Sequence, residues 1–174
     1  MPTYRKTLKS PCFPRLPEAE TMYAISIQST DFNLETEEQL AEQSSSNCGA
    51  LVSFVGKVRG KDHEQLLSHL YLEHFPGVTE QEIEKIILTA QQKWPLQYVK
   101  VIHRIGEIKT GEKIVLVLTA SEHRKDAYQA NEFIMDYLKT EAPFWKKECF
   151  ANGDAHWVDM KKSDLDHTQQ WNQA

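Results

Sequence analysis

From Met22 onward the chain alternates short segments with a strand-like pattern and longer segments with a helix-like pattern, and no other feature constrains its fold as strongly. Strand-like segments place an apolar residue at every second position or form short apolar runs, whereas helix-like segments repeat apolar residues every three or four positions. The patterns predict strands at 23–27, 49–55, 66–73, 98–103, 113–120 and 156–160, and helices at 34–43, 79–94 and 125–139. Because directly paired strands outnumber strand–helix–strand units, we expect an α+β single domain with a mixed, mostly antiparallel sheet packed with helices.

Two of the expected helices carry an apolar stripe that must pack against another element. The stripes consist of Ile83, Ile86, Ile87 and Ala90 in the first helix and of Ala127, Ala130, Phe133, Ile134 and Leu138 in the second. Thr79 and Glu82 have the spacing of an N-terminal capping box. Pro95 and Pro143 follow the two helices, and a proline there prevents simple continuation of the helix.

The two ends of the chain lack these patterns. Residues 1–21 contain four of the seven prolines, and the first 15 residues carry four basic and no acidic side chains. This segment has no apolar core of the kind that a signal peptide needs, so we expect a flexible N-terminal extension. The sequence therefore predicts a folded domain at 22–164 and a polar C-terminal tail at 165–174.

The distribution of charge distinguishes between classes of ligand. The net charge is −5, but residues 16–45 alone carry seven acidic and no basic side chains, so the rest of the chain is almost neutral. Within that part, bases occur in short stretches beside glycine and histidine. Nucleic-acid binding usually needs a continuous basic stripe, so this pattern favours a small anionic ligand over nucleic acid.

The cysteines and the apolar runs indicate the cellular compartment in which we expect the protein. Cys12, Cys48 and Cys149 are widely spaced and form no CxxC pair, so we expect neither a structural zinc site nor a disulfide framework. No apolar run approaches the roughly 18 residues that a membrane helix needs. We therefore expect a cytoplasmic protein that does not span a membrane. The candidate site residues named below require no metal or other cofactor.

Lys139 and Lys146 lie on the two sides of a proline. If a helix ends near Lys139, a turn begun by Pro143 and anchored by Phe144 and Trp145 would bring both ammonium groups to one pocket. A lysine that is partly desolvated or lies beside other cations loses proton affinity, and it can then act as a base or nucleophile near neutral pH. The alternative is a pair of solvated lysines flanking an ordinary turn, since exposed lysines are the rule.

Two His-Arg pairs follow predicted strands. His123 and Arg124 begin a helix, and the free N–H groups at a helix N-terminus bind anions, to which an arginine adds a bidentate contact. The alternative is that Ser121 caps the helix and His123 is a surface residue. His103 and Arg104 end a strand before a glycine turn, where a structural role for the histidine is expected.

Lys57 and Arg59 follow a predicted buried strand and lie between two glycines. Strand alternation places both side chains on one side of the chain, and the glycines allow a ligand to approach the backbone closely. The alternative is that both residues lie at a solvated hairpin end, which joins the strand at 49–55 to an antiparallel strand at 66–73. The P-loop pattern is absent, so this is not a nucleotide cradle of that type.

Five stretches of the chain occur in the same order in one enzyme family. They are GALVSFVGKVRG, LYLEHFPGVTE, KWPLQYVKVIHRIGEI, TASEHRKDAYQANEFIMDYLKTEAPFWKKE and HWVDMKKSD. By these stretches, which run from about residue 49 to residue 164, the chain resembles the catalytic large subunits of molybdopterin synthase. The segment FIMDYLKTEAPFWKKE is close to a signature of that family.

The resemblance implies a sulfurtransferase of molybdenum cofactor biosynthesis that converts cyclic pyranopterin monophosphate to molybdopterin. Sulfur would arrive as the C-terminal thiocarboxylate of a small ubiquitin-like sulfur-carrier subunit. Two large subunits would form a homodimer at the core of a heterotetramer. The alternative function is a non-catalytic anion or nucleic-acid binding module that uses the same basic clusters.

The resemblance also implies roles for individual residues. Lys139 and Lys146 would be the essential catalytic lysines; we hypothesise that the first works at the sulfur-transfer centre and the second polarises the substrate phosphate or ring. The substrate-binding residues would be Lys57, Val58, Arg59, His123, Arg124, Lys147 and Glu148, with the His-Arg pair coming from the neighbouring subunit. Lys161 stands where the family has an arginine, and a lysine offers a phosphate only a point charge.

Overall fold

The computed structural model describes residues 22–44, 47–62, 65–159 and 162–171 of the 174-residue chain. The expected extension at 1–21, the end of the tail at 172–174 and Lys161 lie outside the described residues. The elements are β1 (Met22–Gln28), α1 (Leu34–Gln43), β2 (Ala50–Lys57), β3 (Lys61–Asp62), β4 (Gln65–His74), α2 (Val78–Lys93), β5 (Leu96–Arg104), β6 (Gly106–Lys109), β7 (Lys113–Ser121), α3 (Arg124–Thr140), β8 (Phe144–Phe150), β9 (Ala155–Val158) and α4 (Lys162–Gln170).

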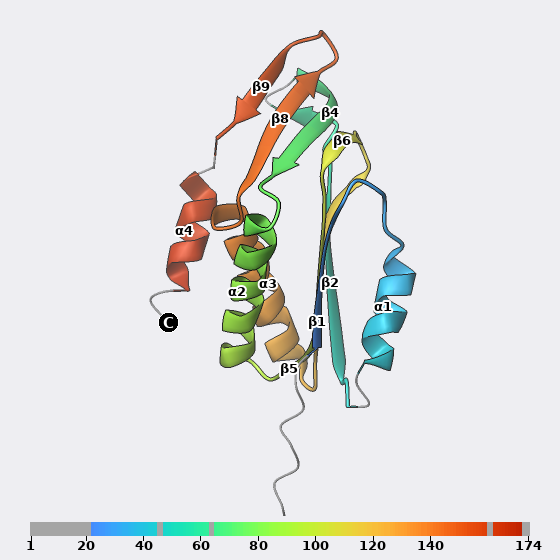
Figure 1. Ribbon diagram of the computed structural model, residues 1–174, viewed down its shortest axis with the longest axis vertical. Coiled ribbons are helices and arrows are strands. Elements are labelled where there is room, and N and C mark those ends of the chain that lie inside the picture. Colours follow the sequence, from blue (N-terminus) through green and yellow to red (C-terminus); the bar gives the residue numbers. More distant parts are fainter. Residues whose placement is uncertain (1–21, 45–46, 63–64, 160–161, 172–174) are drawn as a thin grey trace, which may run out of the picture.

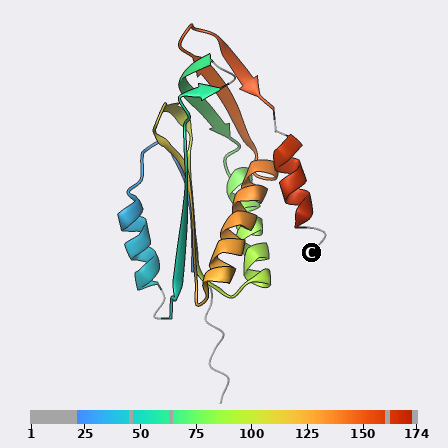
Figure 2. The ribbon, with the colours of Figure 1, turned by 180° about the vertical axis from the view of Figure 1, so that it is seen from behind.

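The larger sheet has the strand order β1-β5-β7-β2. β1 pairs with β5 in parallel, whereas β5 and β2 each pair with β7 in antiparallel register. Helices α2 and α3 cover one face of this sheet and α1 covers the other, as the views in Figures 1 and 2 show from opposite sides. The α+β class and the mostly antiparallel sheet expected from the sequence are confirmed.

The main core lies between the sheet and the helix pair α2–α3. Both predicted apolar stripes are buried there against the valines of β5 and β7. On the opposite face, Ile102, Leu116 and Leu118 pack with Phe32 and with Ala41 of α1. The central strands β5 and β7 are thus covered on both faces, which explains why their sequences read as nearly continuous apolar runs.

A second sheet has five strands but fewer strand residues than the first. This smaller sheet lies at the end of the molecule where β2 ends and β7 begins, at the top of Figure 1. Its strand order is β3-β4-β8-β9, and β6 also pairs with β4. The expectation that the strand at 66–73 pairs with the strand at 49–55 is wrong, because β2 pairs with β7 while β4 pairs with β3, β6 and β8. In this arrangement Leu70 and Leu72 are buried together with Ile108 and Phe150.

The segment that was expected to form a proline-initiated turn with aromatic anchors is mostly strand. Only residues 141–143 connect α3 to β8, and Phe144 and Trp145 are already in the strand. β8 is stabilised by antiparallel pairing with β4 and with β9. β4 is distant in the chain, and β9 follows β8 only after a turn. The local sequence is dominated by Pro143 and by charged residues, so by itself it does not indicate a strand.

Part of the expected polar tail is helical. Helix α4 packs against α3, where Thr168 is buried and its hydroxyl lies 3.0 Å from that of Thr140. Just after α4, Trp171 makes edge-to-face contacts with Trp94 and Phe133 and donates a hydrogen bond to Asp136. One aromatic residue produces no helical repeat of apolar positions in the sequence. The sequence pattern therefore does not predict this helix. None of the helices in the described ranges is both long and apolar enough to cross a membrane.

Candidate functional site

Lys146 and Glu148 lie on the same face of β8 and form an ion pair. The Lys146 Nζ atom is 3.1 Å from Glu148 Oε1, and the Glu148 side chain is only 8% exposed. Their cross-strand partners in β4 are the buried residues Leu72 and Leu70. A carboxylate buried at this position has to be paired with a cation, so Glu148 holds the Lys146 ammonium in a defined place.

Lys147 lies on the opposite face of the same strand. Strand alternation directs its side chain away from Lys146 and Glu148. Its Nζ atom lies 5.7 Å from the ring centroid of Trp157, and its register partners are Tyr71 and Trp157. The structure therefore brings Lys146 and Glu148 together and separates Lys147 from them.

Lys139 occupies the last turn of α3, immediately before the connector to β8. Its Nζ atom is 3.1 Å from Asp164 Oδ1 of α4, and about half of the side chain is exposed. A cation at this position interacts favourably with the C-terminal end of the helix dipole. Lys139 and Lys146 thus flank one short connector, and each has a carboxylate partner.

The segment Lys57, Val58 and Arg59 lies where the two sheets meet. Val58 is 3% exposed, packs beneath the smaller sheet, and exchanges backbone hydrogen bonds with Glu112 and Gly111. Lys57 and Arg59 are exposed on either side of it. The buried valine therefore anchors a segment that carries two cations beside the smaller sheet, which contains β8.

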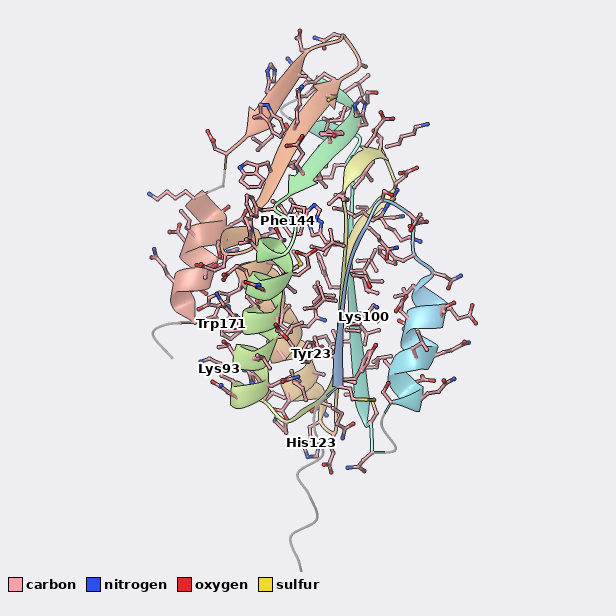
Figure 3. The ribbon with its side chains drawn as sticks, in the orientation of Figure 1. Tyr23, Lys93, Lys100, His123, Phe144 and Trp171 are labelled. Atoms are coloured by element: carbon pink, nitrogen blue, oxygen red, sulfur yellow. The ribbon has the colours of Figure 1, made fainter. Side chains whose placement is uncertain are left out.

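His123 and Arg124 lie at the other end of α3 from Lys139. Both are exposed, and His123 occupies the N-cap position without a side-chain capping bond. A helix of 17 residues is about 25 Å long, so one copy of the chain does not bring this pair to the lysines. Figure 3 shows His123 and Phe144, the first residue of β8, at opposite ends of the helical layer. Ser121 does not cap the helix, because its hydroxyl donates to the carbonyl of Pro95.

His103 has the structural role that its sequence position suggested. Its ring stacks on Phe144 with centroids 3.7 Å apart and planes inclined by 17°, and its Nδ1 atom lies 2.9 Å from the Arg104 carbonyl oxygen. The pKa of His103 is lowered from 6.5 to about 4, mainly by burial and to a smaller extent by the neighbouring His74, against the opposing effect of the Arg104 carbonyl. The ring is therefore neutral in the folded protein at neutral pH.

The lowered pKa of this partly buried histidine predicts a pH-dependent stability. The unfolded chain binds a proton at His103 near pH 6.5, whereas the folded chain binds it only near pH 4, so the free energy of unfolding falls as the pH falls through this window. The loss attributable to His103 is about 2 kcal/mol between pH 7 and pH 5. Urea denaturation at both pH values would measure it, with His103→Phe as the non-titrating control. An equal loss in the control variant would contradict this assignment.

No group of three or more His, Cys, Asp or Glu side chains in the described ranges is arranged to hold a metal ion. Cavities in the same ranges occur between α3 and α4, lined by Asp136, His167 and Trp171 among others, and beside Cys48. Neither cavity is lined by a predicted site residue. These two cavities are therefore not part of the candidate site around the α3–β8 connector.

Comparisons with known proteins show to which family the chain is related. The family model described as "MoaE protein" matches residues 27–141. A molybdopterin synthase catalytic subunit from Vibrio cholerae is 47% identical over 149 residues, which cover 86% of this chain and 98% of the relative.

Solved structures of related proteins share the fold. The molybdopterin biosynthesis MoaE protein of Burkholderia ambifaria superimposes with a TM-score of 0.72 at 41% identity, covering 87% of this chain and 97% of that one. The molybdopterin synthase structure from Staphylococcus aureus gives a TM-score of 0.70 at 31% identity, covering 77% and 96%. From the match over most of its length, together with the shared fold, the chain belongs to the MoaE family.

Proposed function

We propose that this chain is the catalytic subunit of a molybdopterin synthase. It converts cyclic pyranopterin monophosphate to molybdopterin by transferring two sulfurs from the C-terminal thiocarboxylate of a small ubiquitin-like carrier subunit. The observation that carries this proposal is the 47% identity to a molybdopterin synthase catalytic subunit over almost all of that relative. The cytoplasmic location is proposed with it, supported by Cys48 and Cys149, which are both free thiols.

The lysines that flank the α3–β8 connector are proposed as the catalytic residues. A thiocarboxylate that passes on its sulfur through a tetrahedral centre develops negative charge on oxygen, and a nearby ammonium stabilises that charge. Lys139 serves this centre, where its helix-end position leaves half of the side chain accessible. Lys146 polarises the substrate phosphate or ring, and Glu148 orients its ammonium.

The phosphate of the substrate requires further cations, and these come from two copies of the chain. Lys57 and Arg59 flank Val58, which packs in one cluster with Phe150 of β8. His123 and Arg124 lie a helix length away in the same copy, so they serve the site of a neighbouring copy in a homodimer. Two such sites, each receiving one carrier subunit, make a heterotetramer.

Reconstitution of the reaction tests this function. The full chain, the thiocarboxylated carrier subunit and cyclic pyranopterin monophosphate are expected to yield a dithiolene product, and each ligand alone is expected to raise the thermal midpoint of the chain. Absence of product, together with RNA binding that weakens steeply with salt, would instead favour the nucleic-acid binding module.

Deletion of residues 1–21 is expected to leave dithiolene formation within about twofold of the full chain, because no proposed site residue is removed. In the described ranges the first strand begins at Met22, and every proposed site residue lies beyond it. The measurement is the specific activity and thermal midpoint of the 22–174 variant beside the full chain. A large loss of activity with an unchanged thermal midpoint would assign the extension a part in the reaction.

A further inference from the structure

We propose that Thr79, at the start of α2, is a positioning residue that sets where Lys139 and Lys146 lie relative to each other. It does so by holding the connector at 141–143 through a hydrogen bond from its buried side chain to Pro143. The inference rests on the proposed function, because it gives both lysines a role in one reaction. No motif in the sequence indicates it, since Thr79 was expected to be a helix cap.

The hydroxyl of Thr79 links two loops. It accepts a hydrogen bond from the backbone N–H of Phe75 at 3.0 Å and donates one to the carbonyl oxygen of Pro143 at 3.1 Å. Thr79 is completely buried. Without the hydroxyl, the Phe75 N–H and the Pro143 carbonyl oxygen would each lose this hydrogen bond, and the contact between the two loops would weaken.

The same hydroxyl is not needed to begin the helix. Helix α2 starts after Gly77, whose φ of 81° is a conformation that favours glycine. The Gly77 N–H donates to the Glu80 carboxylate at 2.7 Å, so the first turn is capped by Glu80 rather than by the expected pair of Thr79 and Glu82. The Thr79–Pro143 bond is therefore a tertiary contact, and its loss acts on the connector rather than on the helix end.

A second contact holds the same connector from the other side. Phe144 stacks on His103, and the Phe144 N–H donates to the Ala142 carbonyl at 2.9 Å. With the hydroxyl of Thr79 on Pro143, the connector is held by α2 and by the end of β5. The beginning of β8 is therefore fixed to the main core, and Lys146 follows two residues later.

This geometry bears on catalysis because the two lysines lie on different elements. Lys139 moves with α3 and Lys146 with β8, and residues 140–145 are the only chain between them. A displacement of about 1 Å between reacting groups can cost about a hundredfold in rate. Holding the connector thus keeps the positions of both ammonium groups fixed relative to one substrate.

The test compares Thr79→Val, which keeps the shape but removes the hydroxyl, with Thr79→Ser, which keeps the hydroxyl. Thr79→Val is expected to lower kcat for dithiolene formation by about ten- to a hundredfold with KM changed by less than about threefold. Thr79→Ser is expected to remain within about threefold of the parent kcat. Thr89→Val is the matched control, because Thr89 lies exposed in the same helix and donates only to the Lys85 carbonyl.

A folded Thr79→Val protein with the parent kcat, assayed well below its thermal midpoint, would overturn the inference. So would an equal loss of kcat in the serine and valine variants. If Thr79→Val does not fold, Thr79→Ala takes its place, because it also removes the hydroxyl, and a folded Thr79→Ala protein with the parent kcat overturns the inference in the same way. Failure of the proposed function is seen separately, as absence of product from the unaltered chain.

Discussion

Lys146→Ala is expected to reduce dithiolene formation at least about a hundredfold, the usual size of the contribution of a positioned charged group that acts in the transition state. The expectation follows from the placement of Lys146, whose ammonium is held 3.1 Å from Glu148 and lies at the start of β8 beside the α3–β8 connector. The measurement is kcat and KM with the thiocarboxylated carrier and the pterin substrate. Lys85→Ala, which removes an exposed lysine of α2 paired with Glu82, is the control for loss of a lysine elsewhere.

The same substitution also affects stability, and the two effects can be separated. Removing the ammonium leaves the Glu148 carboxylate buried without its partner, which costs about 1–2 kcal/mol; the full cost for a buried pair is reduced because a third of Lys146 is exposed. The double variant Lys146→Ala, Glu148→Gln removes the orphaned charge and is expected to recover most of the thermal midpoint but none of the activity. Recovery of activity in the double variant would show that Lys146 acts only by neutralising Glu148.

Most of the secondary structure could be predicted because its signals are local. The stripe from Ile83 to Ala90 and the alternation around Ile25 are each contained within one element, and the helices and strands found there confirm them. The pairing of β4 and the existence of β8 could not be predicted, because they depend on contacts between segments far apart in the chain. Helix α4 was missed because its main anchor, Trp171, lies beyond its end.

The candidate site likewise has features that the local sequence could predict and features that depend on distant contacts. Lys139 and Lys146 could be singled out because their spacing around Pro143 and the surrounding motif are local. The separation of Lys147 from Lys146 follows from strand alternation, and it could have been predicted had the segment been identified as a strand. The hydrogen bond from Thr79 to Pro143 joins residues 64 positions apart, and neither local sequence contains a pattern that predicts it.

A mixed dimer is expected to restore activity that its two parent variants lack. In a homodimer of Lys146→Ala every site lacks the lysine, and in a homodimer of Arg124→Ala every site lacks the arginine. If Arg124 serves the site of the neighbouring copy, a dimer with one copy of each variant has one site that lacks both residues and one site that is intact. Such dimers, purified through two different tags, are then expected to show about half of the parent activity.

The matched control is a mixed dimer of Lys146→Ala with Lys139→Ala. These two lysines flank one connector in one copy, so each site of that dimer lacks one of them and no activity is expected to return. Recovery with Arg124→Ala but not with Lys139→Ala follows only if the 17-residue helix α3 carries Lys139 for one site and Arg124 for the other. If neither mixed dimer recovers, Arg124 acts within its own copy or the two variants impair assembly, and the two-copy site is wrong.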